Sequence, residues 1–385
     1  MKLISLTLLS VSALSALVNA SPLFDQLRIF TSTSETERRL VKYSEDSPAR
    51  WMTEADKEAL IRAGIKFMDI TDYPSTSVNS FANWVPYIPT KVEYKDEVQP
   101  FIGNLTTETM KDVLTTFTSF RNRYYKSQYG AQSCRWLIEQ IREIASGYDH
   151  VSVDEFEHNW DQFSIVARFE GSNQDLENEL VIVGAHQDSV NSWFPYFGRS
   201  PGADDDGSGT VTILEAFRSL VHNGFKPERP VEFHWYSGEE GGLLGSQAVS
   251  RKYNEEGKKV VAMLQNDMTG FIGKNKENEV IGIVTDHVDE KSFTFLKLTG
   301  FLKTLVDNYA DIPYSLTECG YACSDHASWR KLGFPSAFTI ESDFDNSNPY
   351  IHSTRDVIEN LSFDHMKEFA KVAVGFAVEL SHVRD

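Results

Sequence analysis

Short apolar runs alternate with helix-like segments from about residue 180 to the end of the chain. The runs of strand length cover residues 180–185, 231–236, 261–265, 280–284 and 336–340. Apolar residues at helical spacing mark the segments 213–221, 293–305 and 363–380. Strands and helices in alternation are typical of a parallel sheet buried between helical layers. We therefore expect a single globular α/β domain with a mainly parallel, mixed central sheet and helices on both faces.

Acidic residues and histidines follow these apolar runs, at the points where the strands should end. They are His186, Asp188, Asp205, Glu239, Glu240, Asp267 and His352. Ligands of such sheets bind beyond the carboxyl ends of the strands, so these side chains should lie at one edge. Oxygen and nitrogen donors without thiolates suit zinc in a hydrolytic site.

The acidic turn at 204–206 has a competing interpretation, because its spacing also matches a calcium-binding EF-hand loop. We reject that interpretation, since Pro201 and Gly202 precede the turn where an EF-hand has a helix, and Glu215 belongs to a helix of its own. Each of the other acidic or histidine motifs alone is common on protein surfaces. Their repetition at successive strand ends favours one shared site.

Six motifs carry a resemblance to a known family: GAHQDS, PGADDDGSG, SGEEGGLLGSQ, QNDMT, CGYACSDHASW and NPYIHSTRD. From about residue 100 onward, the chain resembles the secreted co-catalytic di-zinc aminopeptidases of bacteria and fungi, which have an α/β zinc-peptidase fold. The resemblance implies two zinc ions per chain. It makes His186 and Asp267 ligands of one ion, and Glu240 and His352 ligands of the other. It also implies that Asp205 bridges the two ions and that a cis peptide follows it.

The resemblance assigns further roles close to these ligands. Glu239 would be the general base, and Tyr321 would help to hold the developing oxyanion. Cys319 and Cys323 would form a disulfide, which their spacing in an exported chain also makes plausible. From strand alternation alone, we expect Asp188 to lie on the same side as His186 and to orient its imidazole, although an unrelated loop carboxylate is the alternative.

The resemblance also predicts the substrate. Residues at four matching positions would line an apolar pocket for the first side chain of a peptide, namely Met268, Ile340, Phe344 and Ile351. Ordinary core packing is the alternative. We expect release of bulky, Leu-like residues from peptides with a free N-terminus, and the requirement for a free amine rests on the resemblance alone. The rivals are glutaminyl cyclisation or carboxypeptidase action on the same scaffold, and an inert secreted binding module.

The first residues predict export. Lys2 precedes an uncharged, apolar run that ends in small residues at Ala20, so residues 1–20 are typical of a secretory signal peptide. A membrane anchor would need a longer apolar run. The charge-rich segment 21–78, which shows little strand pattern beyond a helix at 53–63, is predicted to be a propeptide that acts as an inhibitor or folding aid. The alternative is an extension that stays attached; residues 79–385 would form the catalytic domain.

Charge limits the partners of the chain. Lys and Arg number 37 against 56 Asp and Glu, which gives a formal net charge of −19 over 385 residues. Such a chain repels phosphate backbones, so we expect no nucleic-acid partner, and no membrane partner either. We expect a secreted monomer with glycosylation sequons at Asn104 and Asn360.

Overall fold

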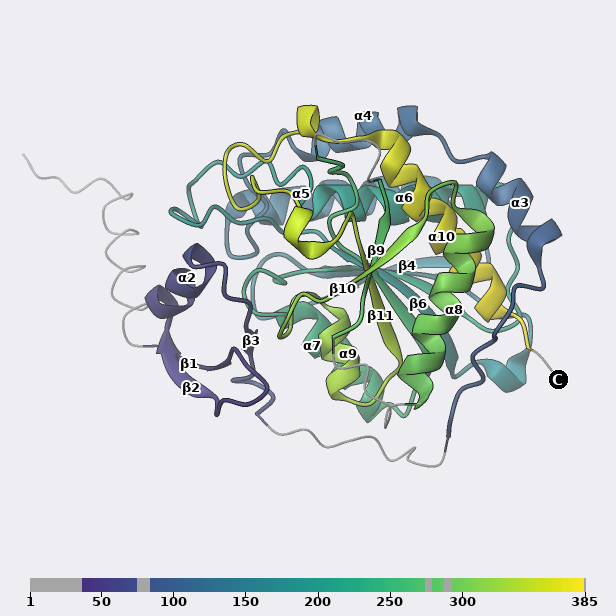
Figure 1. Cartoon of the computed structure of the whole chain (residues 1–385), viewed down its shortest axis with the longest axis horizontal. Helices are drawn as coiled ribbons and strands as arrows, with labels where there is room; N and C mark the ends of the chain where they lie inside the picture. Colours follow the sequence, from purple (N-terminus) through teal and green to yellow (C-terminus); the bar gives the residue numbers. More distant parts are fainter. Residues whose placement is uncertain (1–36, 75–83, 274–278, 287–292, 384–385) are drawn as a thin grey trace, which may run out of the picture.

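The computed structural model describes residues 37–74, 84–273, 279–286 and 293–383 (Figure 1). The predicted signal peptide, 1–20, and the predicted end of the propeptide near residue 78 lie outside these ranges. The described residues form a large α/β unit and a small N-terminal module, residues 37–74, which is drawn in purple beside it.

Within the described residues, eight strands form the central sheet in the order β10-β9-β11-β8-β6-β7-β5-β4. Their bounds are Val151–Phe156 (β4), Ser164–Phe169 (β5), Glu179–His186 (β6), Val231–Tyr236 (β7), Lys259–Asn266 (β8), Ile281–Val284 (β9), Tyr314–Thr317 (β10) and Ser336–Ile340 (β11). The neighbours β11, β8, β6 and β7 are parallel. At one side β5 is antiparallel to β7 and β4 is antiparallel to β5, and at the other side β9 is antiparallel to β11. The expected mixed sheet is confirmed.

Helices cover both faces of this sheet (Figure 1). Alternation along β6 shows why: Val181 and Val183 join the larger hydrophobic core, and Leu180 and Ile182 join a second core on the opposite face. The larger core is formed with α3 (Lys95–Gly103), α4 (Thr107–Phe117), α5 (Gln128–Ala145), α6 (Gly207–His222), α8 (Phe293–Tyr309) and α10 (Phe363–Ser381). The second core receives α7 (Leu244–Glu255) and α9 (His326–Lys331). Short 3₁₀ turns lie at Gln174–Leu176, Phe344–Asn346 and Ile358–Asn360. Among the described residues, none of the helices combines the length and apolarity needed to span a bilayer.

The N-terminal module contains more strand than its sequence indicated. Strands β1 (Arg38–Lys42), β2 (Arg50–Thr53) and β3 (Met68–Asp69) form an antiparallel sheet in the order β2-β1-β3. These strands are short, and the residues of β1 and β2 are mostly half-buried or exposed, so they lack the apolar pattern by which strands are recognised. The predicted helix is present as α2 (Glu54–Arg62), and Thr53 and Asp56 form a capping box at its start.

The module packs against the loops that follow β7 and precede α9. The N–H of Asp69 donates to the carbonyl of Gly242 over 3.0 Å, and the Gln247 side chain donates to the carbonyl of Asp69 over 2.9 Å. Met68 and Ile70 of the module lie in one apolar cluster with Leu243 and Ala322. The module is therefore docked on the edge of the sheet where the predicted site residues lie.

Candidate metal centre

The carboxyl ends of three parallel strands deliver most of the predicted ligands. His186 is the last residue of β6, Glu239 and Glu240 lie shortly after β7, and Asp267 directly follows β8. Two loops supply the others: Asp205 precedes α6, and His352 lies in the long loop after β11 with a positive φ of 55°. The expected convergence at one edge of the sheet is therefore present.

Two groups of three side chains share Asp205. Oδ1 of Asp205 lies 3.2 Å from Nε2 of His186, which is also 3.5 Å from Oδ1 of Asp267. Oδ2 of Asp205 lies 3.0 Å from Nε2 of His352, which is also 3.0 Å from Oε2 of Glu240. In each group the potential ligand atoms lie within 4.8 Å of one another, which is the spacing of a metal site. Asp205 thus offers one oxygen to each group.

Unpaired polar atoms support a metal at this place. Nε2 of His186, Nε2 of His352 and Oε1 of Glu240 are buried and have no hydrogen-bond partner in the described part of the chain. A buried polar group without a partner lowers the stability of the fold, so we expect each of these atoms to bind a ligand. Imidazole nitrogens and carboxylate oxygens without free thiolates are the donors that zinc accepts, and the residues present therefore fit zinc.

The carboxylates also change the basicity of the two histidines. Burial by itself lowers the pKa of His352, but Glu240 and Asp205 raise it to about 10. Burial likewise opposes the rise at His186, whose pKa is held well above its usual value by Asp267 and Glu239. Burial raises the pKa of the Glu239 carboxyl well above its ordinary value, against the attraction of His186. A strongly shifted carboxyl beside a metal site is typical of a general acid or base.

Asp188 does more than the sequence suggested. Its Oδ1 lies 3.4 Å from Nδ1 of His186, on the side expected from strand alternation. Its two oxygens also accept the backbone N–H groups of Glu239 and Glu240 over 3.1 and 3.2 Å. Asp188 thereby connects the end of β6 to the loop after β7 and fixes the predicted base relative to a predicted ligand.

Two positioning residues were missed from the sequence. The carboxylate of Asp206 accepts N–H groups from His186, Gly209 and Met268, so it joins the ends of β6 and β8 to the start of α6. The fully buried Arg123 donates to the carbonyls of Gln187, Pro201 and Gly202. Asp206 could have been suspected as the cap of a helix. Arg123 lies in no motif, and its role depends on contacts more than 60 positions away.

The covalent features implied by the resemblance are present. The peptide bond between Asp205 and Asp206 is cis, and Cys319 and Cys323 form a disulfide. Cys134 is a buried free thiol.

The predicted pocket residues lie together. Met268, Ile340, Phe344 and Ile351 form one apolar cluster, which includes the disulfide. Because Met268 follows Asp267 and Ile351 precedes His352, this cluster adjoins both groups of ligands.

Tyr321 packs against the module. Its ring lies in the module cluster of Met68 and Ile70, and the Lys42 ammonium lies 5.6 Å from its centroid. Tyr321 lines a hollow of about 420 Å³ between the module and α9, whereas its neighbour Ala322 also lines the smaller hollow at Glu239 and Glu240. The predicted contact of Tyr321 with the oxyanion stays a prediction.

A loop of the module covers the ligands. A hollow of about 30 Å³ is lined on one side by Ile61 and residues 64–67 of the module, and on the other by Glu239, Glu240 and His352. Since a water molecule needs roughly 10–15 Å³ by this measure, about two would fit. A bulky apolar side chain of a substrate needs more room than this hollow offers.

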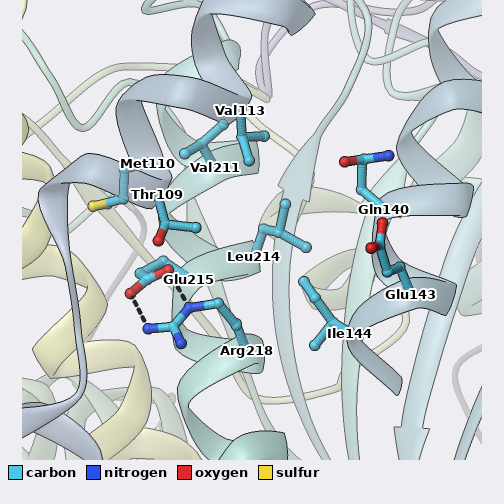
Figure 2. A pocket seen from close by; sticks show the side chains of 10 residues that line it. All are labelled: Thr109, Met110, Val113, Gln140, Glu143, Ile144, Val211, Leu214, Glu215 and Arg218. Carbon is cyan, nitrogen blue, oxygen red and sulfur yellow. Dashed lines mark hydrogen bonds and ion pairs between the residues drawn. The ribbon is translucent and has the colours of Figure 1, made fainter. Parts of the chain in front are cut away.

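The groove in Figure 2 is a different kind of hollow. It has a volume of about 130 Å³ and lies between α4, α5 and α6, with Met110, Val211 and Leu214 among its lining residues. At one end Glu215 is paired with Arg218 at 2.6 Å (Figure 2). The described residues that line it include no histidine or cysteine, so it offers no comparable metal site.

The sequence and the fold were compared with those of known proteins. Residues 164–377 match the model of peptidase family M28. Leucine aminopeptidase 1 of Chaetomium globosum is 48% identical over 345 residues, which cover 86% of this chain and 82% of that protein. Leucine aminopeptidase 1 of Blastomyces gilchristii is 45% identical over 97% of this chain and 96% of its own. Among solved structures, the aminopeptidase LapA of Legionella pneumophila superposes with a TM-score of 0.76 at 28% identity, covering 90% of this chain and 94% of that one. These matches confirm the family expected from the motifs: the chain belongs to peptidase family M28, whose members are zinc-dependent hydrolases.

Proposed function

We propose that this chain is the exported precursor of a two-zinc aminopeptidase. The mature enzyme would remove bulky apolar residues from the N-terminus of peptides. The observation that carries the proposal is the pair of ligand groups joined through Asp205, with Glu239 beside them. The relatives named leucine aminopeptidase 1 support the substrate class.

The residues have separate roles in this proposal. His186 and Asp267 would hold one ion, Glu240 and His352 the other, and Asp205 both. Two zinc ions, when bound, polarise the scissile carbonyl and acidify a water molecule. Glu239, which belongs to neither ligand group, would take the proton of the attacking water and deliver it to the leaving amine. Burial raises the pKa of the Glu239 carboxyl, which favours its taking up a proton.

The apolar cluster of Met268, Ile340, Phe344 and Ile351 is proposed to receive the first side chain of the peptide. Such a cluster favours large apolar groups but discriminates weakly among them, by about 1–3 kcal/mol per methylene. Tyr321 can approach the oxyanion only after the module has left, since its ring now packs against the module.

The N-terminal module is proposed to be an inhibitory propeptide, removed after cleavage of a signal peptide at residues 1–20. The small remaining hollow over Glu239 and His352 supports this role. The mature enzyme would be a secreted monomer, in keeping with the net charge of −19 of the whole chain. Asn104 is the better glycosylation site, because it is exposed, whereas Asn360 is half-buried.

Hydrolysis of a leucine anilide tests the function. We expect little activity of the full chain, a large increase after proteolytic separation of the module, and loss of that activity on chelation. Zinc should restore it, with about two ions bound per chain. Activity that survives chelation would contradict the proposal. Cyclisation of N-terminal glutamine with one zinc bound would favour the rival activity, and zinc binding without any turnover would favour an inert module.

Zinc affinity should rise with pH. Because the pKa of His352 is raised to about 10 and that of His186 also lies above its usual value, both rings hold their protons more tightly in the metal-free protein than a free imidazole does. A ligating nitrogen must be neutral, so binding releases these protons, and affinity should rise about tenfold per pH unit for each proton released. Competition with a chelator of known pH dependence between about pH 6 and 8 measures this slope, and turnover should fall towards pH 6. An affinity independent of pH would contradict ligation by the two histidines.

A further inference from the structure

Lys66 belongs to the loop of the module that covers the ligands. The loop joins α2 to β3, and Lys66 lines the small hollow together with Glu239, Glu240 and His352. The lysine is half-buried, and among the described residues it makes no ion pair. Other cations of the module behave differently: Lys57 and Arg39 each pair with Asp69 at 2.9 Å.

The charges that Lys66 faces are those of the metal site. Burial by itself disfavours the charged ammonium, but four carboxylates of the centre outweigh it and raise the pKa of Lys66 above its ordinary value. In order of their effect they are Glu239, Asp205, Glu240 and Asp267. The positive charge of Lys66 is therefore attracted by the carboxylates of the metal site.

The backbone next to Lys66 holds it in this position. Phe67 and Met68, which follow it, are buried. The N–H of Asp69 donates to Gly242 over 3.0 Å, and a Cβ on Gly242 would lie 2.7 Å from that nitrogen, so the close approach requires glycine. Movement of the Lys66 backbone away from the hollow would strain or break these contacts of β3.

We propose that Lys66 makes docking of the N-terminal module and zinc binding oppose each other. The inference rests on the two-zinc centre proposed above. When ionised, the four carboxylates supply four negative charges, more than two protonated histidines can offset, whereas two zinc ions would bring four positive charges. A filled centre would therefore attract an ammonium less than the metal-free centre does. The ammonium and the zinc ions would also repel each other, most strongly where water is largely excluded. By reciprocity, the docked lysine must weaken zinc binding by the same factor by which zinc weakens docking.

The test uses the full chain with its module attached. Zinc affinity is measured by competition with a chromophoric chelator in the wild type, Lys66→Met, Lys66→Arg and Lys42→Met. Met keeps most of the apolar stem and removes the charge, and Arg keeps the charge. Lys42 is a matched control because it lies in the same module but pairs with Glu45 at 3.2 Å. We expect Lys66→Met to bind zinc roughly tenfold more tightly, about 1.4 kcal/mol, while the other two variants resemble the wild type. Equal affinity of Lys66→Met and the wild type would overturn the inference.

Hydrogen exchange provides a second readout. The Asp69 amide reports docking, because it donates to Gly242 across the interface. Zinc should speed its exchange in the wild type, and less so in Lys66→Met. Unchanged exchange on zinc binding would refute the linkage and leave the proposed function intact. Failure of every chain to bind zinc would instead refute the proposed function, and the inference with it.

Discussion

Replacement of Glu239 by alanine is expected to leave zinc binding intact and to reduce turnover of the mature enzyme by about 10²–10⁴-fold, the usual contribution of a general base. The reason is geometric: Glu239 adjoins Glu240 but belongs to neither group of ligand atoms. Its removal takes away the group that accepts the proton of water and leaves the ligands of both ions in place. The measurement pairs kcat with the zinc content of the same sample.

Glu239→Gln is the matched control, since it keeps the size of the side chain and removes its basicity. It should be nearly as inactive as Glu239→Ala. If zinc is lost together with activity in either variant, Glu239 is a ligand and its assignment as the base is wrong.

Replacement of Asp205 by alanine should abolish activity and reduce zinc binding at both sites. Its two oxygens lie 3.2 Å from His186 and 3.0 Å from His352, so one substitution removes a ligand from each group. Asp267→Ala serves as the comparison, because Asp267 belongs to one group only. Zinc titration should show about one tight site in Asp267→Ala and none in Asp205→Ala. Two tight sites in Asp205→Ala would contradict the bridging role.

The sequence predicted best those parts of the fold that are buried on both sides. Strands β7 and β11 have the predicted bounds, and β6 extends the predicted run by one residue at each end. These strands are continuous apolar runs because helices cover both of their faces. The ligands could be predicted for a related reason. Each lies after a buried strand or in a loop with a distinctive motif, and these strands all end at the same edge of the sheet.

The rest depends on exposure and on distant contacts. Strand β4 is largely half-buried or exposed, and its polar and apolar residues gave no clear run, so it was missed. The strands of the module were missed for a similar reason, because they are short and contain no continuous apolar run. Arg123 and Lys66 were missed because single basic residues carry no local pattern, and each acquires its role only when a remote segment packs against the centre. Tyr321 was assigned by resemblance alone, and in the docked state its ring packs against the module.

The buried Arg123 sets a lower limit on how short a working enzyme can be. Its guanidinium group satisfies three carbonyls in the two loops that lead to Asp188 and Asp205, in an interior where no solvent replaces a lost donor. Yet the part of the chain that matches the family model starts only at residue 164, some forty positions later. A fragment cut to those family bounds would keep every proposed ligand and lose the side chain that holds their loops together. The smallest catalytic unit of this protein must therefore begin upstream of Arg123.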